Sequence, residues 1–314
     1  MTQAIQTIEQ GNLPIHLYDT PEAMGAASAQ SLSEKQIALA AEQDTIGFLI
    51  MAAPSAFGFY SAYLEQAKES KPLQEALART HFFQFDDYPL PADHPATFRY
   101  LLNEHFFNAL TQWCPRENIH AFNVDGADPD QICEDYTQHV LESGLDIQLK
   151  GVGENGHWGF HEPGIPLDGD PRYMSVELSE ENALQQLRDH PDLFASADEV
   201  PRIAYTANVS IFMKTIHLIE DNIPQAAKGF AILAAYGNDT VDKAVPTSIL
   251  KQHPNAHVRI TQAAAAELLE YSARGCVTEE SLERMAMALG GKEEATSARE
   301  YVKTVLSTMG LLDS

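Results

Sequence analysis

Cysteine is scarce in this sequence, and long apolar runs are absent. The three cysteines, Cys114, Cys133 and Cys276, are odd in number and far apart, so they predict neither a disulfide framework nor a Cys-x-x-Cys metal site. No apolar run approaches the ~20 residues that a membrane-spanning helix needs. The first nine residues also lack the basic and apolar regions of a secretory signal peptide. We therefore expect reduced thiols and a cytoplasmic protein.

Basic residues are also few. Lys and Arg together number 20 against 45 Asp and Glu, which gives a formal net charge of −25. Nucleic acids and anionic membranes both need a basic face, so we expect neither as a partner. A small anionic ligand is not excluded, because a few cations or a helix N-terminus suffice for one phosphate. We expect most of the surplus acid to lie on the solvated surface.

Strand-like and helical segments alternate along most of the chain. The run Thr45–Met51 is continuously apolar, which is typical of a strand buried on both faces of a parallel sheet. Eight further strands are predicted in the same alternation, at residues 13–18, 80–85, 119–124, 145–151, 172–178, 202–209, 215–219 and 257–260. We predict an α/β fold: a doubly wound, mostly parallel, Rossmann-like sheet with helices on both faces. It forms one domain over residues 1–276, and two amphipathic helices form a C-terminal helical extension over residues 277–314.

The densest cluster of glycine, histidine and acid is the segment Gly151–Gly164, which follows a strand-like run. It contains five glycines, together with His157, His161 and Glu162. Glycines let backbone N–H groups approach a ligand closely, and the titratable side chains supply groups for acid–base chemistry. We predict that this segment is an active-site loop.

The spacing of residues in this loop also matches two other kinds of site. Gly151-x-Gly153-x-x-Gly156 matches the dinucleotide-binding pattern, but that pattern needs a helix to open near its third glycine. His157 and His161, four residues apart and followed by Glu162, would share a metal-binding face on a helix. Gly159 and Pro163 argue against any helix here, so both interpretations are disfavoured. For His161 alone a structural role is favoured.

The acid pair Asp86-Asp87 ends another predicted strand. In open α/β sheets, ligands bind outside the carboxyl ends of the strands, and the strand before Gly151 ends at the same edge. A carboxylate and a histidine-rich loop at one edge are the groups that acid–base catalysis uses. By spacing alone, helix caps or solvated loop acids explain the pair equally well.

With these segments in view, the sequence resembles the glucosamine-6-phosphate deaminase/isomerase family. Gly-Val-Gly-Glu-Asn-Gly-His-Trp-Gly-Phe-His-Glu-Pro-Gly is similar to the family's signature loop. Phe85-Asp-Asp-Tyr88 and Pro246-Thr-Ser-Ile-Leu-Lys-Gln-His-Pro254 resemble two further family segments, in family order. The resemblance spans roughly residues 45–270, and the loop is its specific part. A galactosamine-6-phosphate type is one branch that it leaves open.

The resemblance implies an aldose–ketose isomerisation of an amino-sugar phosphate with loss of ammonia, without a metal or organic cofactor. Asp86 falls on the family's general base, which moves a proton between C2 and C1. His157 falls on the histidine that opens the sugar ring, and Glu162 on the acid that orients it. An imidazole suits proton transfer near neutral pH.

The remaining site residues follow from the same resemblance. Asn155 stands where the family commonly has Asp, and His161 where it has Asn; the segment 52–58 replaces a Gly- and Thr-rich phosphate loop. The substrate-binding residues it predicts are Ser55, Asp87, Gly153, Gly156, Arg188 and Lys228. An amide at position 155 can hold an imidazole by a hydrogen bond but cannot stabilise an imidazolium by charge.

Two alternatives stay open. One is a lactone hydrolase, because 6-phosphogluconolactonases share the fold and a similar Gly-x-Gly-x-x-Gly-His pattern; the other is a sugar-phosphate sensor without turnover. Glu162-Pro-Gly164 after the histidine favours the deaminase side. The sequence also leaves open the sugar epimer, an allosteric effector and assembly into a homo-oligomer.

Overall fold

The largest element of the fold is an eight-stranded sheet. The structure is a computed structural model and describes residues 3–126, 128–291 and 295–312. In spatial order, the strands are β1 (Gln6–Gln10), β2 (Leu13–Tyr18), β11 (Ala256–Thr261), β10 (Leu218–Ile223), β7 (Ile147–Lys150), β3 (Ile46–Ile50), β4 (Thr80–Gln84) and β6 (Ile119–His120). Every neighbouring pair is parallel except β1 with β2. The predicted, mostly parallel sheet is therefore confirmed.

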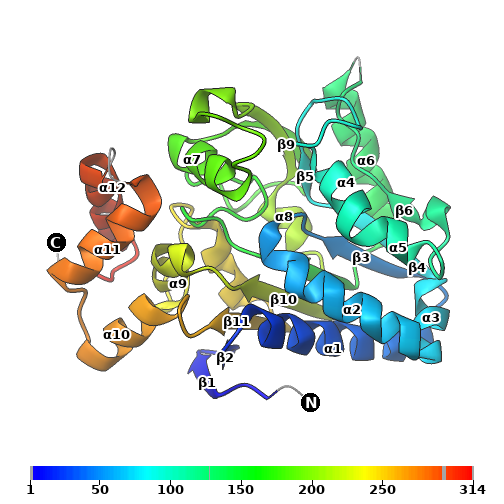
Figure 1. The fold of residues 1–314 in the computed structure, drawn as a ribbon, viewed down its shortest axis with the longest axis horizontal. Helices are drawn as coiled ribbons and strands as arrows, with labels where there is room; N and C mark the ends of the chain where they lie inside the picture. The colour runs from blue at the N-terminus through cyan, green and yellow to red at the C-terminus, as the bar shows by residue number, and fades with distance from the viewer. Residues whose placement is uncertain (1–2, 127, 292–294, 313–314) are drawn as a thin grey trace.

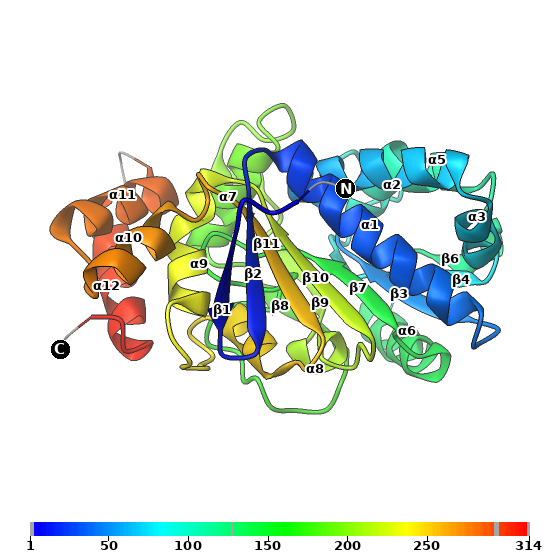
Figure 2. The same cartoon turned by 90° about the horizontal axis from the view of Figure 1, so that it is seen from below.

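Helices lie on both faces of this sheet. They are α1 (Pro21–Ala40), α2 (Phe57–Glu69), α3 (Lys71–Leu77), α4 (Phe98–Leu102), α5 (Asn108–Leu110), α6 (Pro129–Ser143), α7 (Glu180–Asp189), α8 (Val209–Phe212), α9 (Gly229–Tyr236) and α10 (Ala266–Arg274). Figure 1 shows α1 along the lower face of the sheet and α7 and α8 above it. In Figure 2 the same α1 crosses in front of the strands. Because both faces are covered, every residue of β3, β7 and β10 is buried.

Two strands expected in the parallel sheet form a separate sheet instead. β8 (Tyr173–Glu177) and β9 (Ile203–Ala207) pair antiparallel, and β9 also pairs antiparallel with β5 (Asp86–Asp87). Buried and exposed residues are mixed along β8, which suits an antiparallel strand with one solvated face. This small sheet holds Asp86 just beyond the C-terminal end of β4, a strand of the large sheet.

Three boundaries differ from the sequence prediction. A first strand, β1, pairs with β2 through a tight turn at Gly11, whose φ of 59° favours glycine. The strand expected over 119–124 is only two residues long. The helix expected from His94 begins at Phe98, where Thr97 Oγ1 accepts a hydrogen bond from Tyr100 N. Local turn and cap chemistry overrode the apolar pattern at these points.

The two C-terminal helices pack against the α/β unit. They are α11 (Glu279–Gly290) and α12 (Ala295–Thr308), and both contact α9. Leu282, Met285 and Leu306 belong to the same core cluster as the sheet residues. The boundary at residue 276 between domain and extension stays a prediction.

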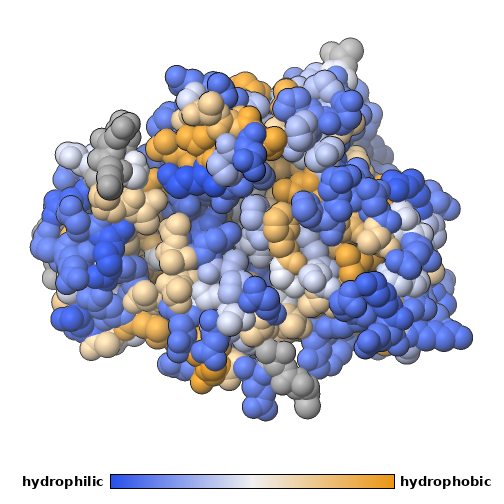
Figure 3. Space-filling model, in the orientation of Figure 1, coloured by the Kyte–Doolittle hydropathy of each residue, from blue (hydrophilic) through white to orange (hydrophobic). Residues whose placement is uncertain are grey.

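The face of the molecule seen in Figure 3 is mainly polar. Figure 3 shows hydrophilic residues over most of this face and hydrophobic residues gathered nearer its centre. Among the residues described, no helix is both long enough and apolar enough to cross a membrane.

Candidate active site

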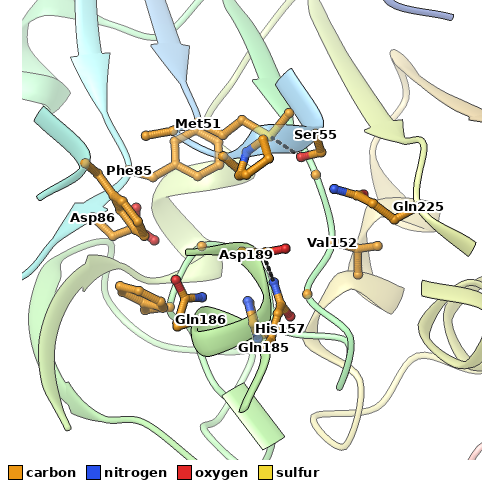
Figure 4. A pocket seen from close by; sticks show the side chains of 18 of the residues that line it. Met51, Ser55, Phe85, Asp86, Val152, His157, Gln185, Gln186, Asp189 and Gln225 are labelled. Atoms are coloured by element: carbon orange, nitrogen blue, oxygen red, sulfur yellow. Dashed lines mark hydrogen bonds between the residues drawn. The ribbon is translucent and has the colours of Figure 1, made fainter. Parts of the chain in front are cut away.

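The ends of several strands meet at one pocket. It lies at the C-terminal ends of β3, β7 and β10, between β5 and α7 (Figure 4). Its lining includes Met51, Ser55, Phe85, Asp86, Val152, Gly153, His157, Gln185, Gln186, Asp189, Gln225 and Lys228. The predicted meeting of an acid and a histidine at this edge of the sheet is therefore confirmed by the position of Asp86 and His157.

The loop after β7 is held in a compact turn without a helix. Gly153 N donates to His157 O at 3.0 Å, and Gly156 N donates to Gly153 O at 3.0 Å. Gly156 and Gly159 have φ values of 91° and 58°, which a side-chain-bearing residue rarely adopts. The helix that a dinucleotide-binding loop needs does not follow Gly156, as the sequence predicted.

A chain of hydrogen bonds orients the imidazole of His157. Asn155 Oδ1 lies 2.8 Å from His157 Nδ1 and also accepts from His157 N at 3.1 Å. Asn155 Nδ2 donates to Glu162 Oε2 and to Ser179 Oγ, both at 3.1 Å. A carboxylate only accepts, so Glu162 fixes the amide with its oxygen toward the imidazole. Nδ1 of His157 therefore carries the hydrogen, and Nε2 is left as an acceptor.

The environment of His157 keeps its ring neutral. Burial, followed by the positive charges of Lys228 and Lys150, lowers the pKa of His157 to about 3. A neutral imidazole with a free Nε2 is a general base. The amide at position 155 fits this state, because it holds the ring without favouring its charged form.

Glu162 does not line the pocket. It lies at the far end of the hydrogen-bonded chain from His157 through Asn155, which we call the relay. Its other oxygen, Oε1, accepts from Asn182 Nδ2, and burial raises the pKa of the carboxyl. No hydrogen bond joins Glu162 to His157 among the described residues. The expected orienting effect of Glu162 thus passes through Asn155, an intermediate that the sequence did not predict.

Gly153 has no side chain, and this leaves room for the imidazole of His157. A Cβ on Gly153 would lie 2.0 Å from Cε1 and 2.2 Å from both nitrogens of His157. The ring therefore packs directly on the Gly153 backbone, and no larger residue fits there without moving it. Gly156 lies outside the pocket, where a Cβ would meet Val245 at 2.8 Å.

Asp86 occupies the opposite wall of the pocket. The backbone of Asp86 pairs with that of Thr206 in β9. A Cβ on Gly159 would lie 3.1 Å from Oδ2 of Asp86. The side chain is 4% exposed. Burial and then the neighbouring charge of Asp87 raise the pKa of Asp86 well above its usual value. A carboxyl group with a raised pKa is a stronger base once it is ionised.

Asp87, expected to bind substrate, lies behind the pocket wall. Its carboxylate accepts from the backbone N–H groups of Tyr88, Phe98 and Arg99 at 2.8 to 3.1 Å. Arg99 Nη1 lies 3.5 Å from Asp87 Oδ2. The prediction of a ligand contact is corrected, because these bonds make Asp87 the anchor of the first turn of α4.

The expected phosphate ligands are only partly brought together. Ser55 and Lys228 line the pocket, but Arg188 does not. Arg188 forms an ion pair with Glu154 and donates to Leu289 O of α11 at 3.2 Å. Its role as a substrate ligand stays a prediction.

Lys228 is the cation that faces the pocket. It is 4% exposed, and no hydrogen bond or ion pair holds its ammonium among the described residues. Burial lowers the pKa of Lys228, while Asp189 and Glu154 act in the opposite direction. A buried, unengaged ammonium is suited to pair with an anionic ligand group.

His161 is a core residue. Its Nδ1 accepts from Val209 N at 3.3 Å, its side chain is fully buried, and it does not line the pocket. The described part of the chain contains no group of three or more His, Cys, Asp or Glu arranged to hold a metal ion. The structural interpretation of His161 fits these contacts.

The sequence did not reveal the pocket wall contributed by α7. Gln185, Gln186 and Asp189 lie on it, and Gln185 Nε2 donates to Asp189 Oδ2 at 3.1 Å. Gln185 Oε1 also accepts from Glu154 N at 2.7 Å. Their spacing on one helix face was the available signal, but polar residues on a helix face are usually solvated.

Known proteins resemble this chain in sequence. The family model described as glucosamine-6-phosphate isomerases/6-phosphogluconolactonase matches residues 19–159. A glucosamine-6-phosphate deaminase of Shouchella clausii is 31% identical over 210 residues, which cover 66% of this chain and 79% of the relative. One from a Geobacillus species is 35% identical over 179 residues, covering 55% of this chain and 66% of the relative.

Solved structures share the fold. A monomeric glucosamine-6-phosphate deaminase matches with a TM-score of 0.69 at 23% identity, covering 80% of this chain and 98% of its own. The 6-phosphogluconolactonase of Thermotoga maritima matches with a TM-score of 0.60 at 16% identity, covering 79% and 99%. This chain belongs to the glucosamine-6-phosphate isomerase/6-phosphogluconolactonase family.

Proposed function

We propose that this chain is an enzyme that converts a hexosamine 6-phosphate into a ketohexose 6-phosphate and ammonia. The observation that carries the proposal is one pocket with a buried carboxyl on one wall and an oriented, neutral imidazole on another. The curated relatives described above carry the name glucosamine-6-phosphate deaminase, which supports the same reaction.

In this proposal, His157 opens the sugar ring. Nε2 takes the proton of the O1 hydroxyl and returns it to the ring oxygen, so the C1–O5 bond breaks and an aldehyde forms. The Asn155–Glu162 relay holds the ring plane during both transfers. The step needs an imidazole that starts neutral, which is the state favoured by burial of His157.

Asp86 then moves the proton that defines the isomerisation. Its carboxylate removes the C2 proton from the open-chain sugar and delivers it to C1 through an enolamine, while the ammonium group on C2 loses a proton and O1 gains one. The resulting iminium at C2 adds water and releases ammonia, which leaves the ketose. Apolar neighbours of Asp86 in the pocket, Phe85 and Phe160, limit solvation of the carboxylate.

Lys228 and Ser55 are the groups that we assign to the phosphate. The Lys228 ammonium supplies charge, and the Ser55 hydroxyl, which also lines the pocket, supplies a donor. The free thiols of Cys114, Cys133 and Cys276 support action in the cytoplasm.

A substrate panel tests this function. Purified protein is incubated with glucosamine and galactosamine 6-phosphates, the unphosphorylated amino sugars and 6-phosphogluconolactone, and ammonia, ketose and acid are measured. We expect ammonia and ketose in equal amounts from a hexosamine 6-phosphate. Lactone hydrolysis alone would identify a hydrolase, and binding of hexosamine phosphates without turnover would identify a sensor.

Substitution of Gly153 tests the position of the imidazole. We expect Gly153→Ala to lower kcat by about 100-fold, because the new methyl group displaces His157 from the relay. Thermal unfolding should change little, since the displaced ring moves into the pocket. Gly169, around which a Cβ meets nothing within 4 Å, supplies the control variant Gly169→Ala. Equal activity of the two variants would contradict the packing role of Gly153.

A further inference from the structure

A fully buried ion pair lies at the end of β7, where the loop that carries His157 begins. Lys150 is the last residue of β7, and its Nζ is 2.6 Å from Oδ2 of Asp221 on β10. The two residues are register partners in the parallel sheet, and both side chains are fully buried. Burying two charges usually costs more than an apolar pair of the same size, so stability alone does not explain Lys150.

The ammonium of Lys150 contacts the residue after His157 directly and is linked to the residue before it through Thr247. Nζ lies 4.5 Å from the centre of the Trp158 ring, which is the residue after His157. Nζ also donates to Thr247 Oγ1 at 3.2 Å, and Thr247 N donates to Gly156 O at 3.1 Å. Gly156 precedes His157, so one ammonium is linked to both neighbours of the histidine.

Asp221 and Trp158, the two residues that hold the Lys150 ammonium, each make a further contact. Tyr236 OH donates to Asp221 Oδ2 at 2.5 Å, and the Trp158 ring stacks on Phe212 with centroids 5.0 Å apart and planes 11° apart. The cation over the aromatic face adds an attraction that an apolar side chain would not supply. The ammonium therefore has little freedom to move away from the loop.

The charges around His157 give Lys150 a second effect. Lys228 and Asp189 line the pocket with Asp86, and Glu162 lies beyond Asn155. After burial, the positive charges of Lys228 and then Lys150 are the causes that lower the pKa of His157. We expect a bound phosphate to neutralise the charge of Lys228. Lys150 differs, because its partner carboxylate is already in place in the protein without substrate.

We propose that Lys150 is a positioning residue for His157: its ion pair with Asp221 holds the Gly156–Trp158 backbone, and its ammonium is part of the charge that surrounds the imidazole. The kinetic part of this inference rests on the proposed function. Its structural part concerns only the histidine and its supporting ion pair.

The test replaces both members of the ion pair by uncharged side chains of similar size. In Lys150→Met with Asp221→Asn, the amide oxygen still accepts from Tyr236, and no lone buried charge remains. The matched control is Arg259→Met with Glu220→Gln, which removes another buried pair, 2.6 Å apart, between β10 and β11. If the first double variant does not fold, Lys150→Gln with Asp221→Asn replaces it.

Two measurements are compared. Histidine NMR, with His157 assigned by loss of its signal in His157→Gln, follows the pH at which the ring gains its second proton. We expect this pH to rise by about one unit in the Lys150 double variant and to stay unchanged in the control. We expect kcat to fall about tenfold with KM for the hexosamine phosphate changed less than twofold.

An unchanged His157 titration in the folded Lys150 double variant overturns the proposal, whether or not kcat falls. An equal shift in the Arg259 control also overturns it, because the effect would then be general. A shifted titration in a protein that turns over no hexosamine phosphate leaves the Lys150 role standing and rejects the proposed function.

Discussion

Replacing Asp86 with Asn should abolish turnover. We expect Asp86→Asn to lower kcat by at least about 1,000-fold, because an amide cannot take the C2 proton. Exchange of that proton with solvent deuterium should disappear, while binding of the sugar phosphate is retained. Proton NMR of the substrate in deuterated buffer measures the exchange directly.

The pH dependence of the unmodified protein supplies a second arm of the same prediction. Asp86 must be ionised to act, so kcat/KM should rise with pH through the raised pKa of this carboxyl. The acid limb should therefore lie above the usual range of about 4 for an aspartate. His157, with a pKa of about 3, stays neutral across that limb. Retained C2 exchange in Asp86→Asn would assign the base to another group.

Replacing His157 should instead impair only ring opening. We expect His157→Gln to slow turnover of the ring form by about 100-fold, since Gln cannot accept and return a proton. An analogue that lacks both the C4 and the C5 hydroxyl can close neither a five- nor a six-membered ring, and its isomerisation should be nearly unaffected. The two substrates are compared by ammonia release under identical conditions.

His161→Gln is the matched control for this prediction. His161 lies in the same loop and is also buried, but its Nδ1 contacts the backbone of Val209 and it does not line the pocket. We expect its turnover to stay within a few-fold of the unmodified protein. Equal slowing of both substrates by His157→Gln would reject a role confined to ring opening.

Much of the fold could be predicted from the sequence because its signals are local. A continuous apolar run predicted β3 as a strand buried on both faces, strand-like alternation predicted β7, and the alternation of strands with helices predicted the parallel sheet. The small sheet was missed, because β5 is two residues long and its partners come from far along the chain. Pairing direction is not encoded in any one of these segments.

The sequence by itself determined the site loop: its glycines, the absence of a helix, and the presence of Asp86 and His157 at one edge of the sheet. Only the tertiary structure decided how the other residues are used. Asn155 joins Glu162 to His157, Asp87 anchors α4, and Arg188 pairs with Glu154. These roles depend on which side chain reaches which partner across the fold. A polar residue in a sequence carries no record of that partner, because its hydrogen bonds are chosen by packing.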